Sequence, residues 1–187
     1  MLTAGLAIAV IAAAVGILFH RTATARTTTR LAGERLAADE ALWRRYNIIG
    51  DMIPWAANDG AEATQALFQT VIAARAEVMK TRSDVEARLK AEDRMQAALN
   101  AFYRAAYADD DLLGVHEFVV IAAYALRADE RAYGAVSAYA GARSAFAAQT
   151  SSALWRALLM LYGVSMPAPM VLAVAPDHPP PADRPLA

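Results

Sequence analysis

The chain contains no cysteine, which excludes disulfide bonds and thiol nucleophiles. Histidine is scarce, with three residues in 187, and the nine glycines never cluster as phosphate-binding loops require. Acidic and basic residues are interleaved and nearly balanced, with a formal net charge of −1, so no basic face favours a nucleic-acid partner. The sequence therefore offers no catalytic residues, no cofactor motif and no site for a small-molecule substrate.

One long uncharged apolar run is present, Leu2–Phe19. As a helix with a rise of about 1.5 Å per residue it reaches roughly 27 Å, close to the hydrocarbon thickness of a bilayer. Lys and Arg are absent before it and four arginines follow it: Arg21, Arg26, Arg30 and Arg35. Basic residues beside a membrane helix favour the cytoplasmic side. The pattern predicts a single-pass transmembrane anchor over residues 1–21, with the N-terminus outside and the rest in the cytoplasm.

A cleaved secretory signal is the alternative interpretation of this run. Ala23, Thr24 and Ala25 resemble the small-residue motif at which such signals are cut, although no basic residue precedes the run and the run is long for a signal. This alternative predicts a periplasmic helical bundle that binds a small ligand or a metal. The abundance of Ala and Arg, with only two lysines, is typical of a GC-rich bacterial genome, so the membrane of the first interpretation is the bacterial inner membrane.

Residues 22–165 show helical spacing of their apolar side chains and lack the alternation of a strand. Ser83 and Glu86 fit a capping box at the start of one helix, and the acidic run Asp109–Asp111 suits the start of the next. Pro54 permits two interpretations, a kink in one long helix to about Arg82 or a new helix beginning near Asp59; we favour the kink. The chain is thus predicted to be all-α, an antiparallel, coiled-coil-like bundle of three long helices plus a short fourth at about residues 151–163.

The last segment, residues 166–187, contains seven of the eight prolines. Proline removes a backbone donor and breaks helices, so this density predicts an extended, flexible tail. Such a tail is either a recognition segment or a spacer. The domain organisation is therefore an anchor at 1–21, a bundle at 22–165 and a proline-rich tail at 166–187.

The run Arg44-Arg45-Tyr46-Asn47-Ile48-Ile49-Gly50-Asp51 after a short anchor resembles the LemA family, whose pattern here is Arg-Arg-x-Asp-Leu-Ile-Pro-Asn. Asn47 stands in place of the usual Asp, and Gly50-Asp51 in place of Pro-Asn, which marks a divergent member. Further similarities occur at Ala74-Arg75, at Tyr107-Ala108-Asp109, at Tyr139 with Phe146, and at Tyr162-Gly163. The resemblance implies a membrane-anchored antiparallel bundle that acts as an adaptor or scaffold, and it brings no catalytic residues with it.

Arg44, Arg45 and Trp55 form a candidate interaction surface. Adjacent arginines on one helix face different ways, so at least one is expected at the surface, where it would contact a partner or a lipid headgroup. The competing interpretation for Arg45 or Arg44 is a salt bridge at the edge of the core with Asp39, Glu40 or an acid of another helix. Trp55, beside Pro54, is expected to contribute to an exposed groove.

Two acidic groups invite chemistry and have simpler explanations. Asp109–Asp111 with His116 contain metal-ligand types, but helix capping accounts for the acids and the spacing of a calcium loop is absent. Glu92 with Asp93 could form a carboxylate pair, but Arg88, Lys90 and Arg94 interleave them as on a solvated face. The sequence thus predicts no cofactor and no metal. It predicts a non-enzymatic, membrane-anchored adaptor or scaffold whose partner is an unidentified membrane-associated protein.

Overall fold

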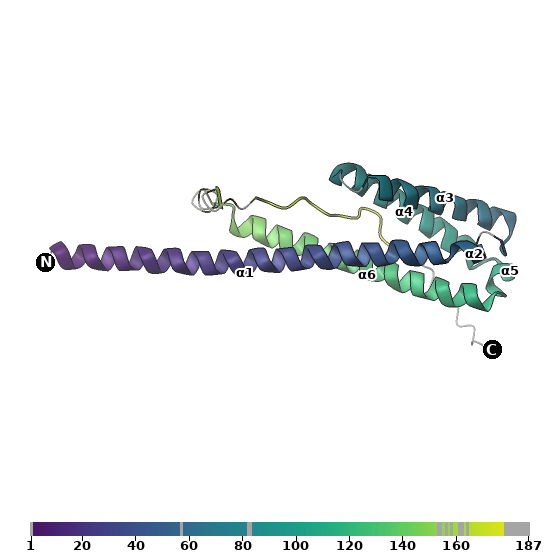
Figure 1. The fold of residues 1–187 in the computed structure, drawn as a ribbon, viewed down its shortest axis with the longest axis horizontal. Coiled ribbons are helices and arrows are strands. Elements are labelled where there is room, and N and C mark those ends of the chain that lie inside the picture. The colour runs from purple at the N-terminus through teal and green to yellow at the C-terminus, as the bar shows by residue number, and fades with distance from the viewer. Residues whose placement is uncertain are drawn as a thin grey trace.

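The computed structural model describes residues 2–56, 58–81, 84–152 and 165–177, with five further positions between 153 and 164, and it leaves the side chains of residues 2–15 and 17–20 undescribed. The described part is all-helical, as predicted, and contains no strand. Its elements are α1 (Leu2–Asp51), α2 (Ile53–Ala56), α3 (Glu62–Lys80), α4 (Val85–Ala106), α5 (Asp110–Leu113) and α6 (His116–Gln149). The extended stretch 165–177, here called the C-terminal segment, follows (Figure 1).

Four long helices form the bundle, so the prediction of three long helices is wrong. At Pro54 the chain does not continue in one direction, since α1 ends at Asp51, α2 makes a single turn, and α3 runs back along the bundle (Figure 1). The connection is held by Asp109, whose Oδ2 accepts a hydrogen bond from the Ala61 amide at 2.8 Å. A Cβ on Gly60 would lie 3.3 Å from that same oxygen, so the turn needs a small residue there. Within the expected short fourth helix, at about residues 151–163, the described positions 155, 157, 159 and 160 are helical, and six positions lie outside the described residues.

The helices are arranged as two antiparallel pairs, α1 with α6 and α3 with α4 (Figure 1). Small side chains on α6 allow α1 to come close, because Ala122, Ala125 and Ala132 are all buried there. Buried positions recur in steps of three, four or seven residues on both helices, as in a coiled coil. They include Leu31, Ala38, Leu42, Arg45 and Ile49 on α1, and Phe118, Ala122, Ala125, Asp129, Ala132, Val136, Tyr139 and Phe146 on α6.

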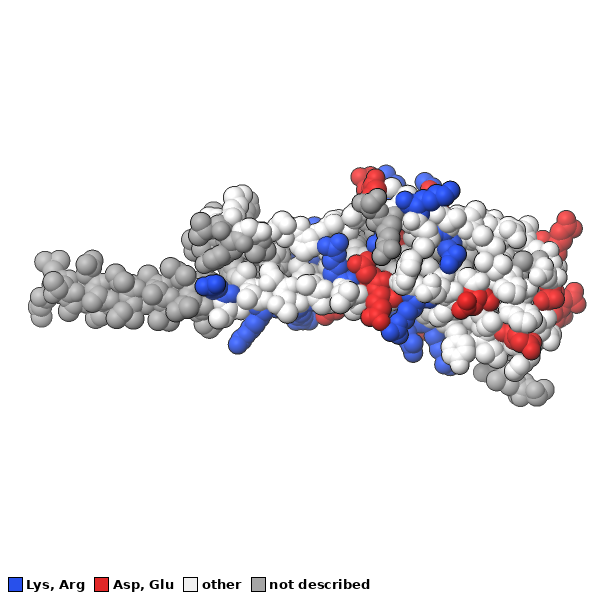
Figure 2. All heavy atoms as spheres, in the orientation of Figure 1, with Lys and Arg blue, Asp and Glu red and all other residues white. Residues whose placement is uncertain are grey.

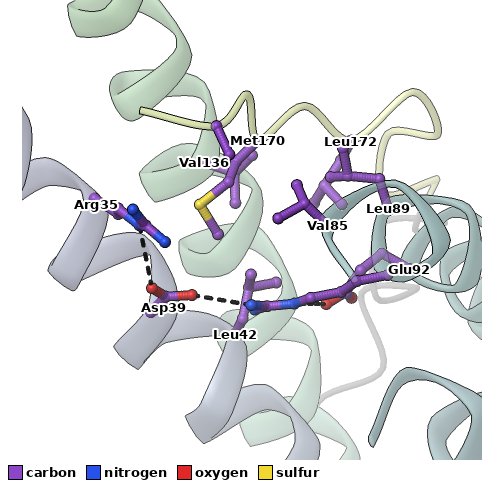
Figure 3. Close-up of a pocket in the computed structure, with 11 residues that line it drawn as sticks. Arg35, Asp39, Leu42, Val85, Leu89, Glu92, Val136, Met170 and Leu172 are labelled. Carbon is purple, nitrogen blue, oxygen red and sulfur yellow. Dashed lines mark hydrogen bonds and ion pairs between the residues drawn. The ribbon is translucent and has the colours of Figure 1, made fainter. Parts of the chain in front are cut away.

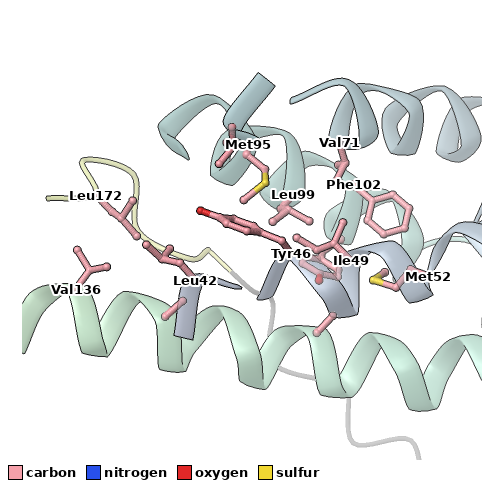
Figure 4. Close-up of a cluster of buried hydrophobic side chains, with 14 of the residues drawn as sticks. Leu42, Tyr46, Ile49, Met52, Val71, Met95, Leu99, Phe102, Val136 and Leu172 are labelled. Atoms are coloured by element: carbon pink, nitrogen blue, oxygen red, sulfur yellow. The ribbon is translucent and has the colours of Figure 1, made fainter. Parts of the chain in front are cut away.

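Larger side chains fill the space between the two pairs (Figure 4). Phe102 of α4 is central, with its ring 4.8 Å from Phe68 of α3 and 6.3 Å from Phe118 of α6. Tyr46 and Ile49 of α1 enter the same cluster. Burial of these side chains holds the pairs together, because each buried large apolar side chain contributes about 1.5–3 kcal/mol.

The expected anchor falls on residues whose side chains lie outside the described part of the chain. Among the residues that are described, no helix is both long enough and apolar enough to cross a bilayer. The backbone of α1 is helical from Leu2 to Asp51 without a break, and its N-terminal half projects beyond the other helices (Figure 1).

The start of α4 is capped one residue later than the sequence indicated. Asp84 is the N-cap, and its side chain accepts a hydrogen bond from the Ala87 amide at 3.0 Å. The expected cap, Ser83, lies outside the described residues. An aspartate satisfies the free amides of the first turn as well as a serine does, so the helix begins where the capping pattern placed it to within one residue.

Candidate functional site

A charged group lies inside the bundle, at a core position of α1. Arg45 is 1% exposed, and its Nε lies 2.6 Å from Asp129 Oδ1 of α6. Its Nη1 lies 3.4 Å from Glu92 Oε2, and its Nη2 donates to Gln96 Oε1 at 2.5 Å, both on α4. One guanidinium therefore joins three helices. With Asn100 these residues form what we call the buried charge cluster: Arg45, Glu92, Gln96, Asn100 and Asp129.

Two amide side chains extend the cluster from the core to the surface of α4. Gln96 Nε2 donates to Asp129 Oδ2 at 2.8 Å and to Asn100 Oδ1 at 3.0 Å. Asn100 Nδ2 then donates to the Ala175 carbonyl at 3.0 Å, and Asn100 Oδ1 accepts from the Asp177 amide at 3.1 Å. A continuous chain of hydrogen bonds thus connects Arg45 with the C-terminal segment.

The cluster contains two carboxyl groups and only one guanidinium group. This excess of acidic groups is reflected in the pKa of Glu92. Burial raises the pKa of Glu92 from 4.5 to about 7; Arg45 opposes the shift, while Asp93 and Asp129 add to it. Burial, and then Asp129, also raises the pKa of Tyr103 above its usual range, against the effect of Arg45. A protonated Glu92 leaves Arg45 and Asp129 as a balanced pair, so the cluster can take up a proton close to neutral pH.

A small pocket lies beside Glu92, where α1, α4, α6 and the C-terminal segment meet (Figure 3). Its polar wall is an ion-pair chain in which Arg88 lies 3.2 Å from Asp39 Oδ1 and 3.7 Å from Glu92 Oε1. Met170 and Leu172 of the C-terminal segment cover it. The pocket volume is about 30 Å³, which suits one or a few water molecules and is far below the roughly 300 Å³ of a metabolite site.

The C-terminal segment lies in a groove between α4 and α6, which we call the α4–α6 groove. On α6, the Tyr139 hydroxyl donates to the Ala168 carbonyl at 2.6 Å, and Arg143 Nε donates to the Pro167 carbonyl at 3.0 Å. On α4, Asp93 Oδ1 accepts from the amides of Ala173 at 2.7 Å and Val174 at 3.2 Å. The segment is extended, as its prolines require. Positions 178–187 of the expected tail lie outside the described residues.

The three residues of the candidate interaction surface do not lie together. Arg44 is exposed and pairs with Glu40 of the same helix at 2.6 Å. Arg45 points the opposite way and is enclosed, so it is not part of any surface; the interpretation as an ion pair with an acid of another helix is confirmed. Trp55 lies in α2 and is half-buried against the core.

The acidic run acts as a helix start. Asp109 caps α5, since its Oδ1 accepts from the Leu112 amide at 3.1 Å and its Oδ2 holds the Ala61 amide. Burial works to raise the pKa of Asp109, but hydrogen bonds from the Thr64 side chain and from backbone amides outweigh it and lower the pKa. Among the described residues, no group of three or more His, Asp or Glu side chains is placed to hold a metal ion.

We expect Asp109→Ala to lower the free energy of unfolding by about 1–3 kcal/mol, because it removes a cap and also breaks the partly buried hydrogen bond to the Ala61 amide. Chemical denaturation measures the change. Asp111→Ala is the matched control, since Asp111 is exposed in the same helix, and it should cost a few tenths of a kcal/mol. Equal losses in the two variants would contradict the role given to Asp109.

One pattern in the sequence could have identified the buried acids that its interpretation missed. Glu92 lies three residues after Leu89 and seven before Leu99, on the apolar stripe of α4, although it was interpreted as part of a solvated face. Asp129 lies between Ala125 and Ala132 at a core position of α6. Charged residues of opposite sign at core positions of different helices are the pattern that identifies such a cluster.

Comparison with known proteins assigns no family. No family model, no curated protein and no solved structure matches the chain. Membership of the LemA family stays a prediction, based on the motif around Arg44 and Arg45 and on the spaced similarities that follow it.

Proposed function

We propose that this protein is a single-pass, membrane-anchored helical bundle that binds another protein at the cytoplasmic face of the bacterial inner membrane and acts as an adaptor or scaffold. The observation that carries the proposal is the continuity of α1. One helix of 50 residues, about 75 Å long, contains both the apolar run and the first helix of the bundle. A bundle on such a helix lies at a fixed distance from the membrane and in a fixed orientation to it.

The stretch between Phe19 and Leu31, the first buried core residue among those whose side chains are described, supports this arrangement. It spans about 18 Å of helix. Two of its threonines keep their hydroxyls on the helix, since Thr27 donates to the Ala23 carbonyl and Thr28 to the Thr24 carbonyl, each at 2.9 Å. The backbone of the stretch is helical throughout, so it forms a short helical spacer between the proposed anchor and the bundle.

The distribution of charge supports the same orientation. Arginines Arg21, Arg26 and Arg30 follow the apolar run, whereas residues 46–74 and 105–126 contain no Lys or Arg. These two ranges meet at the α5 end, where acidic side chains gather (Figures 1 and 2). They contribute seven acids: Asp51, Asp59, Glu62, Asp109, Asp110, Asp111 and Glu117. An anionic cytoplasmic leaflet attracts the basic end and repels the acidic one, which favours an acidic end that points away from the membrane.

Single-cysteine labelling tests the anchor and its orientation, because the chain has no cysteine of its own. Gln69→Cys places a thiol on an exposed position of α3, and Thr3→Cys places one at the N-terminal end of the apolar run. We expect the protein to stay in membranes after an alkaline wash with its full mass. An impermeant maleimide should label Thr3→Cys in intact spheroplasts and Gln69→Cys only after lysis. Loss of the first ~25 residues would overturn the anchor and support the signal-cleaved periplasmic alternative.

Cross-linking in membranes tests the adaptor role. The full chain and a control that carries residues 1–30 alone are purified after cross-linking, and the enriched proteins are compared. We expect at least one protein to be enriched with the full chain only. Equal recovery with both baits would overturn the adaptor role, whatever the labelling experiment shows.

A further inference from the structure

The C-terminal segment is bound to the α4–α6 groove in the way that a peptide ligand is bound to a receptor. Along residues 168–177, side chains that face the bundle alternate with exposed ones, which is the period of an extended chain. Met170 and Leu172 are each 8% exposed, whereas Val171 between them is 54% exposed. Figure 3 shows Met170 and Leu172 pointing into the pocket, toward Val136 of α6 and Val85 of α4.

The six hydrogen bonds of the groove are made to the main chain of the segment, and an exposed ion pair at the end of the segment joins Arg104 to Asp177 at 3.9 Å. Tyr139 and Arg143 donate to carbonyls, Asp93 accepts from two amides, and Asn100 pairs with one carbonyl and one amide. Main-chain contacts do not depend on which side chains the bound segment carries. The groove therefore selects an extended backbone with two apolar side chains two residues apart, and it selects little else.

The segment is held less firmly than the helices. Two buried side chains and six hydrogen bonds must offset the ordering of 13 residues that have no internal hydrogen-bonded structure. The helices it covers do not need it for their own contacts, since α4 packs along α3 and α6 along α1. Such a segment opens locally while the bundle stays folded, which leaves the groove free for another extended chain.

We propose that the α4–α6 groove is a binding site for an extended segment of a partner protein, with apolar side chains at positions i and i+2, and that the chain's own C-terminal segment occupies it until the partner displaces it. The proposal deepens the adaptor function, on which it rests, by naming the surface that binds and the chemistry of its ligand. The partner competes with a segment that is always nearby, so binding to the wild-type chain is weak until the C-terminal segment is released.

The test uses the full chain in detergent and a fluorescent peptide of residues 165–177 as the probe. Met170→Asp with Leu172→Asp in the chain should release its own segment, and fluorescence anisotropy should then show at least tenfold tighter probe binding than to the wild type. A probe with aspartate at the same two positions should not bind.

Adding Asp93→Ala and Tyr139→Phe to the opened chain should weaken probe binding at least tenfold. Tyr124→Phe is the matched control, because Tyr124 is an exposed tyrosine of α6 that lies 15 residues before Tyr139, and it should leave binding unchanged.

Hydrogen exchange on the wild-type chain keeps the proposal falsifiable if the opened variant does not fold. The amides of Ala173 and Val174 should exchange much faster than those of α4, and faster still with saturating probe. No probe binding to a folded opened variant, or exchange as slow as in α4, overturns the proposal. A wild-type dimer that becomes monomeric on opening overturns it in favour of a second copy as the occupant. The readouts are made in detergent, so they are independent of the side of the membrane on which the bundle lies.

Discussion

Replacing Arg45 by methionine is expected to lower the free energy of unfolding by about 3–5 kcal/mol, as removal of one partner of a buried ion pair does. The long apolar side chain fills much of the same space, so the loss is electrostatic rather than a cavity effect. Asp129 would lose the guanidinium that lies 2.6 Å from it, and Gln96 would lose the donor to its side-chain oxygen. Both groups would stay enclosed in the core without compensation. Urea denaturation monitored by circular dichroism measures the change.

The neighbouring arginine supplies the control for this experiment. Arg44→Met removes the same chemical group from an exposed position whose partner, Glu40, is on the same helix, so it should cost less than about 0.5 kcal/mol. The loss in the free energy of unfolding for Arg45→Lys should lie between those for Arg44→Met and Arg45→Met, because an ammonium cannot contact Asp129, Glu92 and Gln96 in one plane. Similar losses for Arg44→Met and Arg45→Met would contradict the buried cluster.

The buried charge cluster explains why this bundle has one register. When the core positions of alanine-rich helices carry only apolar side chains, one helix can slide along another at little energetic cost. Arg45 on α1 meets Asp129 on α6 and Gln96 on α4 in only one alignment. We interpret the cluster as the device that fixes that alignment, since the burial of charges by itself adds little stability.

The helices could be predicted because their apolar side chains recur at helical spacing over long stretches. The direction of the chain after Pro54 could not be predicted, because a kink and a reversal both place the same residues in helices on either side of the proline. The reversal depends on a contact between Asp109 and Ala61, 48 positions apart. Local sequence patterns contain no information on such a contact, so three long helices were predicted where four are present.

The candidate site was predicted in part. Arg45 was placed in an interaction surface, whereas it is buried in the core. The direction of its side chain depends on which face of α1 meets α6, and this follows from the order of the helices in the bundle. Glu92 was assigned to a solvated face because Arg88, Lys90 and Arg94 lie around it in the sequence, although it lies on the apolar stripe of α4. Met170 and Leu172 join the core only because α4 and α6 leave a groove between them.

The pH dependence of stability should be governed by Glu92 across the physiological range. Its pKa is about 7 in the folded chain and near 4.5 in the unfolded one, so between these values the folded chain holds a proton that the unfolded chain has released. The free energy of unfolding should therefore fall as pH rises from 4.5 to 7 and then level off. The fall is about 3 kcal/mol, from about 1.4 kcal/mol per pKa unit. Denaturation at pH 5, 6, 7 and 8 measures it.

Glu92→Gln should remove this dependence, because an amide cannot ionise and resembles the protonated acid in size and shape. The variant should match the wild type near pH 5 and exceed its stability at pH 8. The charged groups that face Glu92 are Arg45 and Asp39 on α1, Arg88 and Asp93 on α4, and Asp129 on α6. Glu86→Gln, at an exposed position of the same helix, should leave the slope unchanged. A wild-type stability that rises between pH 5 and 8 would mean that Glu92 is ionised throughout, held so by Arg45 and Arg88 against its burial.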